Sequence, residues 1–146
     1  DTSGESLMRT LDYRPFLIKP NHHELGALFG VTIFSREEAL FHAKKLQNAG
    51  ARNVLVSLAG MGAVLLDETG AVYQSEAPKG TVVNSVGAGD SMVAGFLAGY
   101  LKTHQYETAF YTGIAAGSAT AFTEWLAEKN EIMALLNKMK PNNSYI

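Results

Sequence analysis

The sequence has 146 residues, 47% of them apolar, and a formal net charge of −2 at pH 7, which is enough for one domain with a buried core. The scattered charges exclude a basic surface for nucleic acid or an anionic membrane, and no apolar stretch approaches the roughly 20 residues that span a bilayer. The absence of cysteine excludes disulfides and thiolate metal sites and favours a cytoplasmic location.

The first part of the chain predicts helices that alternate with short strands. Residues 3–13 predict a helix, and residues 14–21 predict a short apolar strand closed by Pro20. Residues 21–28 and 35–50 predict two more helices, the second with a glutamate three residues after its cap. Cap and stop residues mark the helix boundaries: Ser3, Asn21 or His22, Gly30, Ser35 and Gly50.

The middle of the chain predicts sheet, and the end predicts helix. Residues 53–60 predict a buried strand, and residues 62–78 predict two strands joined by a tight turn at DETG. Three helices are expected at about residues 88–102, 105–122 and 128–139. Strands separated by helices favour an α/β fold, with helices on both faces of a parallel sheet and an antiparallel hairpin at one edge.

The stretch VGAGDS places three small residues before a carboxylate at the start of a predicted helix. Amides in the first turn of a helix lack internal partners and lie at the positive end of the helix dipole. Gly87, Ala88 and Gly89 leave those amides open to an anion such as phosphate. Asp90 among them fits a base beside a transferring phosphoryl group. The alternative is a tight turn in which Asp90 only interacts favourably with the dipole.

Three stretches, in order, resemble the signatures of one family. NSVGAGDSMVAGFL resembles the second signature of the ribokinase-like, or PfkB, sugar kinases, KPNHHE resembles their Asn-x-x-Glu element, and SLAGMG resembles their nucleotide loop. The members most similar to this chain phosphorylate phosphorylated ketohexoses. The resemblance implies that residues 1–146 form one C-terminal, nucleotide-binding segment of the ribokinase-like fold, without the N-terminal sugar-binding half and lid. No secretion signal is visible before the first methionine, Met8, and an opening on Asp1 without an initiator methionine also suggests a segment of a longer protein.

The resemblance also implies an activity, namely transfer of a phosphoryl group from ATP to a small sugar phosphate. It implies ATP and Mg²⁺ as cofactors, a monovalent cation in some members, and a homodimer as the usual assembly. Asp90 matches the base that takes the proton of the sugar hydroxyl, and Gly87, Ala88 and Gly89 match the anion hole for the γ-phosphate. We expect residues 1–146 alone to bind ATP without turnover.

The stretch KPNHHE has two interpretations. In the resemblance, Glu24 holds Mg²⁺ through water, while Asn21 and Lys19 contact nucleotide phosphate. Asn21 and Glu24 are three residues apart at a helix start, so a capping box is an equally good interpretation, and Lys19 is then a solvated lysine. His22 and His23 have no histidine four residues later on the helix, which predicts surface histidines rather than zinc ligands.

The nucleotide loop implied by the resemblance consists of Ser57, Leu58, Ala59, Gly60, Met61 and Gly62. Gly62 allows close backbone approach. Ala59 stands where the family commonly has glycine, and Met61 where a polar residue is expected, so a plain turn between strands is the alternative. Asn84 matches a position near the nucleotide. Ser118 matches a segment that lines the adenine pocket, or else is a small residue between two packed helices.

Two functions from different classes therefore stay open. The chain is either the nucleotide-binding half of a sugar-phosphate kinase or a separate binding module that keeps the fold without the reaction. An upstream sugar-binding half would favour the kinase.

Overall fold

The computed structural model describes residues 4–139 of the chain. The chain divides into two compact units, Asp1–Ala77 and Pro78–Ile146, and each is described by itself. Ser3, predicted as a helix cap, and the polar tail at residues 140–146 lie outside the described residues. Within residues 4–139, no helix has both the length and the apolar character needed to cross a membrane.

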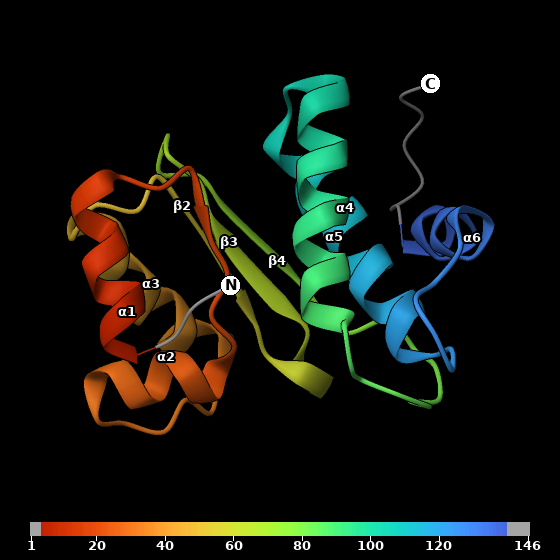
Figure 1. Ribbon diagram of the computed structural model, residues 1–146, viewed down its shortest axis with the longest axis horizontal. Coiled ribbons are helices and arrows are strands. Elements are labelled where there is room, and N and C mark those ends of the chain that lie inside the picture. The colour runs from red at the N-terminus through yellow and green to blue at the C-terminus, as the bar shows by residue number, and fades with distance from the viewer. Residues whose placement is uncertain (1–3, 140–146) are drawn as a thin grey trace. The chain divides into compact units, whose positions relative to one another are not determined.

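The first unit combines helices with one mixed sheet (Figure 1). The strand order is β1-β2-β3-β4, and β1 pairs with β2 in parallel, while β2–β3 and β3–β4 are antiparallel. In chain order the elements are α1 (Gly4–Thr10), the 3₁₀ turn η1 (Leu11–Tyr13), β1 (Leu17–Ile18), α2 (His22–Phe29), α3 (Arg36–Asn48), β2 (Asn53–Ser57), the 3₁₀ turn η2 (Ala59–Met61), β3 (Ala63–Leu66) and β4 (Val72–Ser75).

The α/β class and the edge hairpin β3–β4 are as predicted, but the expected parallel sheet is only partly present. Among the described strands, β1–β2 is the one parallel pair. The reason is the length of the connections, because a parallel pair needs a crossover of about a dozen residues. Residues 19–52 supply that crossover, whereas the links at residues 58–62 and 67–71 permit only antiparallel neighbours.

Helices α2 and α3 begin where their cap residues predict. Asn21 caps α2, and the Ser35 hydroxyl accepts a hydrogen bond from the Glu38 amide at 3.1 Å at the start of α3. The Glu38 carboxylate accepts from the Phe34 amide at 2.7 Å, one residue before the cap. At the other end of α2, Gly30 adopts the left-handed conformation that ends many helices, with φ of 66°. These boundaries follow from local hydrogen bonding.

The core of the first unit forms between the helices and the sheet. Both α2 and α3 pack on β2, and α3 also packs on β3. Val54 and Val56 lie on one face of β2, and their side chains are fully buried in this core. Buried side chains of this core include Leu7, Leu11, Ile18, Leu25, Leu46, Val54, Val56 and Val64.

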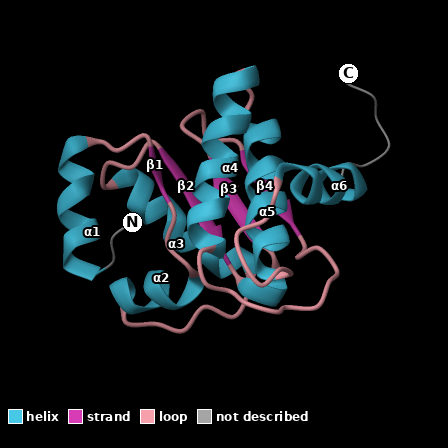
Figure 2. Cartoon of the chain, turned by 45° about the vertical axis from the view of Figure 1, so that its right-hand side comes forward, coloured by secondary structure: helices cyan, strands magenta, loops and turns pink. Residues whose placement is uncertain are grey.

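The second unit is helical and consists of α4 (Ala88–Thr103), α5 (Tyr106–Ala121) and α6 (Lys129–Met139). These bounds agree with the predicted helices to within one or two residues at each end. Figure 2 shows α4 and α5 side by side. Their backbones approach closely because small residues line the contact: a Cβ added at Gly95 would lie 2.6 Å from the Ala116 Cβ and 2.7 Å from the Thr112 carbonyl oxygen.

Candidate functional site

Residues 87–90, which we call the glycine turn, open α4, and Gly87, Ala88 and Gly89 are half-buried. The Ser91 amide donates to the Gly87 carbonyl at 2.9 Å and closes the first helical turn. The Ala88 amide donates to the Ser85 carbonyl at 3.2 Å. The amides of Gly89 and Asp90 have no acceptor within residues 4–139. Two N–H groups therefore remain available at the positive end of a 16-residue helix.

Two observations favour glycine at residue 87. Its φ is 79°, in the left-handed region that disfavours side chains. In addition, a Cβ there would lie 2.8 Å from Cδ2 of Leu126, whose side chain covers the turn. Glycine at residue 87 thus allows both the turn and the contact that covers it.

Asp90 lies in the first turn of α4, is exposed, and makes no side-chain hydrogen bond within the described residues. A carboxylate at this position interacts favourably with the helix dipole without any hydrogen bond. The same exposure leaves its oxygens accessible to an external proton donor. The geometry of Asp90 therefore fits both a catalytic base and a carboxylate that only interacts with the helix dipole. Activity measurements on a variant of Asp90 are needed to distinguish these two roles.

Asn84 lies in the segment that leads into the glycine turn, and both ends of its side-chain amide are engaged. Its Oδ1 accepts from the Val86 amide at 3.1 Å, and its Nδ2 donates to the Glu124 carbonyl at 3.1 Å. The Val83 and Asn84 amides both donate to the Ala121 carbonyl. Asn84 thus ties the approach to the glycine turn to the chain that follows α5. Ser118 is half-buried on α5, in the same unit as Asp90.

The predicted residues of the first unit meet at one edge of its sheet. Asn21 and Ser57 form an isolated parallel bridge, and the Ser57 amide donates to the Pro20 carbonyl at 3.2 Å. The loop at residues 57–62 begins at this edge, and Lys19 is half-buried two residues before Asn21. The two motifs therefore converge, because β1 and β2 run parallel and end together.

Asn21 and Glu24 form the capping box that the sequence allows. The Glu24 amide donates to Asn21 Oδ1 at 2.9 Å, and the Asn21 amide donates to Glu24 Oε2 at 2.8 Å. Glu24 Oε1 has no partner in the described part of the chain. No group of three or more metal-ligating side chains occurs within residues 4–139, so a cation at Glu24 would need water and ligand oxygens to complete its shell.

In the loop at residues 57–62, Leu58 and Gly62 contact the protein itself, whereas the sequence predicted that this loop contacts the nucleotide. Leu58 is buried in the core, so its side chain cannot contact a ligand. Gly62, with φ of 92°, lies so close to the end of β4 that a Cβ would overlap the Ser75 carbonyl oxygen. Its close backbone approach is therefore to the protein's own strand. Ala59 has φ of 49°, a left-handed conformation that explains why glycine suits this position.

A cavity of about 360 Å³ lies beside this loop, between it and the start of α3. Glu37 on its wall has a lowered pKa, because its carboxylate accepts hydrogen bonds from its own backbone amide and from Ser35. The lining residues are Ser35, Arg36, Glu37, Gly60, Met61, Glu76 and Ala77. The wall thus carries two carboxylates and one guanidinium.

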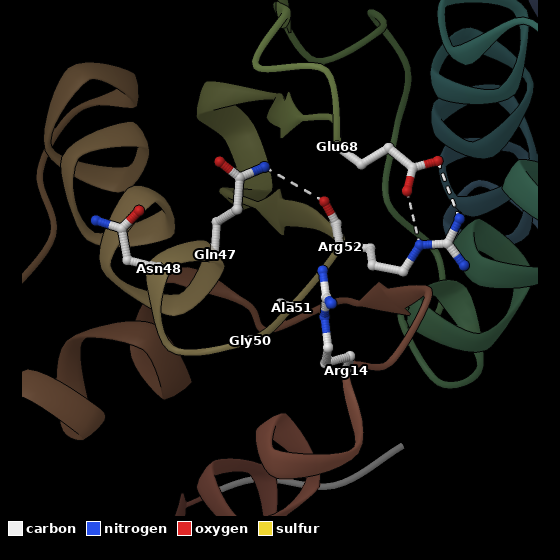
Figure 3. A pocket seen from close by; sticks show the side chains of 7 residues that line it. All are labelled: Arg14, Gln47, Asn48, Gly50, Ala51, Arg52 and Glu68. Carbon is white, nitrogen blue, oxygen red and sulfur yellow. Dashed lines mark hydrogen bonds and ion pairs between the residues drawn. The ribbon is translucent and has the colours of Figure 1, made fainter.

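Two features of the first unit were not predicted. His22 is half-buried, and its Nδ1 is buried without a hydrogen-bond partner, in contrast to the expected surface histidine. A second cavity, of about 340 Å³, lies at the amino end of β2, at the opposite end of that strand from Ser57 (Figure 3). There Arg52 pairs with Glu68 through two hydrogen bonds of 2.6 and 3.1 Å. No local sequence pattern signals either feature, since both depend on long-range packing.

The chain is similar to known carbohydrate kinases, among them phosphofructokinases. The model of the pfkB family of carbohydrate kinases matches residues 1–132. A 1-phosphofructokinase of Bacillus subtilis is 53% identical over 140 residues, which are 96% of this chain and 46% of that protein. A D-tagatose-1-phosphate kinase of Bacillus licheniformis is 38% identical over 133 residues, which are 90% of this chain and 43% of that protein.

Among solved structures, phosphofructokinase-2 from Escherichia coli in complex with substrates and products superposes with a TM-score of 0.84. It is 30% identical, and the match covers 94% of this chain and 45% of that chain. This chain therefore spans about half the length of the relatives that it matches. The family match confirms the predicted family, and superposition on a ribokinase of Arabidopsis thaliana, with a TM-score of 0.72 at 25% identity over 83% of this chain and 40% of that chain, confirms the ribokinase-like fold class. The chain belongs to the pfkB family of carbohydrate kinases.

Proposed function

We propose that residues 1–146 form the C-terminal, nucleotide-binding segment of a kinase that converts fructose 1-phosphate to fructose 1,6-bisphosphate with ATP. The observation that carries this proposal is the 53% identity to a 1-phosphofructokinase, together with two amides at the glycine turn that have no acceptor among residues 4–139. Those amides suit the charge that develops on a transferred phosphoryl group, since phosphoryl transfer depends mainly on positioning and charge stabilisation.

Asp90 is the proposed general base. The acceptor hydroxyl oxygen of the sugar forms a bond to the γ-phosphorus of ATP, the bond from that phosphorus to the β–γ bridging oxygen breaks, and ADP leaves. The proton of the attacking hydroxyl passes to Asp90. The backbone of Gly87, Ala88 and Gly89 forms the proposed anion hole. The exposed Asp90 carboxylate, with no partner in the described residues, supports this role.

ATP and Mg²⁺ are the proposed cofactors, and Mg²⁺ would neutralise phosphate charge. Glu24 Oε1, which has no partner in the described part of the chain, suits a water-mediated Mg²⁺ contact. Lys19 and Asn21 are the proposed phosphate contacts at the same edge. The backbone of residues 57–62 is the proposed nucleotide loop. Asn84 and Ser118 are proposed to line the nucleotide site. A monovalent cation is proposed to bind in the region of Asn84.

The test is a coupled assay of ADP formation by the full polypeptide that carries these residues. Fructose 1-phosphate should give the highest kcat/KM, with tagatose 1-phosphate and tagatose 6-phosphate as the compared acceptors. The 38% identical tagatose-1-phosphate kinase favours tagatose 1-phosphate as the second candidate. Nucleotide binding without ADP formation on any sugar phosphate would instead favour a non-catalytic binding module.

A further inference from the structure

A buried hydroxyl lies directly behind the glycine turn. Thr120, near the end of α5, is only 1% exposed. Its Oγ1 lies 2.9 Å from Ser91 Oγ and 3.2 Å from the Ala127 amide nitrogen. Ser91 follows Asp90 directly and closes the first turn of α4 on the Gly87 carbonyl. One side chain thus links the start of α4 to the chain beyond α5.

The direction of these hydrogen bonds follows from their chemistry. A backbone amide can only donate, so Thr120 Oγ1 accepts from Ala127. The Thr120 hydroxyl proton is then free to donate to Ser91 Oγ, and one hydroxyl serves two partners. Loss of this hydroxyl would leave the Ala127 amide without its acceptor and Ser91 without its donor.

The segment at residues 122–127 is also tied to the glycine turn from the other side. The Glu124 carbonyl accepts from Asn84, and the Leu126 side chain covers Gly87. The Thr123 hydroxyl donates to the Trp125 carbonyl. Trp125 is the only tryptophan in the sequence and is 82% exposed. The single tryptophan of the sequence therefore lies on the segment that contacts the glycine turn.

We propose that Thr120 is a positioning residue that couples the glycine turn to the segment at residues 122–127, so that an anion bound at the turn changes the surroundings of Trp125. The response of Trp125 to a bound anion rests on the proposed function. The coupling between the glycine turn and residues 122–127 does not. The two hydrogen bonds form a continuous path from Ser91 through Thr120 to Ala127, and hydrogen-bond networks of this kind can carry energetic coupling. If Thr120 only filled space in the core, valine would replace it without effect on Trp125.

The first experiment needs no ligand and compares three variants of residues 1–146. Thr120→Val keeps the shape and removes the hydroxyl, while Thr120→Ser keeps the hydroxyl. The matched control is Thr112→Val, on the same helix, where the hydroxyl donates to the Thr108 carbonyl one turn earlier and to no other group among residues 4–139. Circular dichroism checks that each variant is folded, and Ser91→Ala provides a second disruption if Thr120→Val does not fold.

We expect Thr120→Val to raise the exchange rate of the Ala127 amide by roughly fivefold, the factor set by a hydrogen bond of typical net strength. The anisotropy of Trp125 fluorescence should fall in the same variant. Thr120→Ser and Thr112→Val should match the wild type in both measurements. If Ser91→Ala is needed, Trp125 anisotropy should fall with it as well. If Ala127 amide exchange and Trp125 anisotropy are both unchanged in Thr120→Val, the coupling is overturned. If Thr120→Val does not fold, the same result in Ser91→Ala would overturn the coupling.

The second experiment adds Mg-ADP and follows Trp125 emission, with ³¹P NMR as an independent measure of binding. Binding should shift Trp125 emission in the wild type and in Thr112→Val, and the shift should be lost in Thr120→Val. Bound ADP without any shift in the wild type would overturn the transmission to Trp125. Absence of binding by ³¹P NMR would count against the proposed function, while the ligand-free measurements would still decide the role of Thr120.

Discussion

Asn21 and Ser57 lie side by side as a parallel bridge at the carboxyl ends of β1 and β2. The bond from the Ser57 amide to the Pro20 carbonyl, at 3.2 Å, extends the β1–β2 pairing by one step beyond the regular strands. Ligands of α/β proteins commonly bind outside the carboxyl ends of parallel strands. The pairing thus brings the Asn-x-x-Glu motif and the loop at residues 57–62 to the edge where the fold class places its ligands.

Asp90→Asn tests the proposed base in the full polypeptide. The amide keeps the size of the side chain but cannot take a proton, so we expect turnover with fructose 1-phosphate to fall by about 10²- to 10⁴-fold. ATP affinity should stay the same or rise slightly, because a negative charge next to the phosphate is removed. Steady-state kinetics and nucleotide titration measure the two effects.

Glu107→Gln is the matched control for Asp90→Asn, because Glu107 lies in the first turn of α5. If Asp90 only favours the dipole of α4, both substitutions should cost about 0.3–1 kcal/mol of stability and leave the rate intact. Near-normal turnover in Asp90→Asn would remove this residue from the mechanism.

Ala59→Gly should stabilise the protein. Ala59 has φ of 49°, and a left-handed conformation costs a residue with a Cβ about 1–2 kcal/mol, part of which glycine loses again through backbone entropy. We expect a net gain of about 0.5–1 kcal/mol in urea denaturation. Ala27→Gly, at an exposed position inside α2, should instead cost about that amount. Equal effects of the two substitutions would contradict strain at Ala59.

Gly62→Ala should destabilise the protein strongly, since a Cβ there would overlap the Ser75 carbonyl oxygen and φ is 92°. Overpacking and backbone strain together predict a loss of about 2–4 kcal/mol. Gly60→Ala is the control in the same loop, because no atom lies within 4 Å of its added Cβ. Thermal unfolding of the two variants should differ clearly, and a tolerated Gly62→Ala would refute the tight approach to β4.

His42 should make the stability of the first unit depend on pH. Burial and the nearby Lys45 lower the pKa of His42, although Glu38 partly opposes them. Its ring packs against Phe29 and Phe41, with centroids 4.8 and 5.2 Å away. A base with a lowered folded-state pKa binds fewer protons in the folded state, so stability should fall as pH falls below the ordinary histidine pKa of about 6.5.

His42→Phe should remove this pH dependence, because no proton can then bind at residue 42. His23→Phe is the control, as His23 is exposed. Urea denaturation between pH 7.5 and pH 5 should give a smaller loss of stability in His42→Phe than in the wild type. The same loss in both proteins would rule out His42 as the cause.

Local sequence patterns were sufficient to predict several helix ends and turns of this protein. Asn21, Ser35 and Gly30 act through hydrogen bonds and backbone angles within a few residues, so the sequence predicts the ends of α2 and α3 directly. The turn between β3 and β4 also depends on local backbone conformation, since Gly70 in DETG has φ of 90°. The glycine turn is likewise local, because open amides need only small residues before a helix.

The sequence by itself thus determined the helices, the hairpin, the family and the glycine turn, all of which depend on neighbours in the chain or on a shared motif. Only the tertiary structure decided that β2 and β3 pair in antiparallel fashion, that Leu58 points into the core and that Gly62 approaches β4. The same holds for Thr120, whose partners Ser91 and Ala127 lie on both sides of it in the chain. Such contacts join residues from different elements, and the packing of the whole unit selects them rather than any local preference.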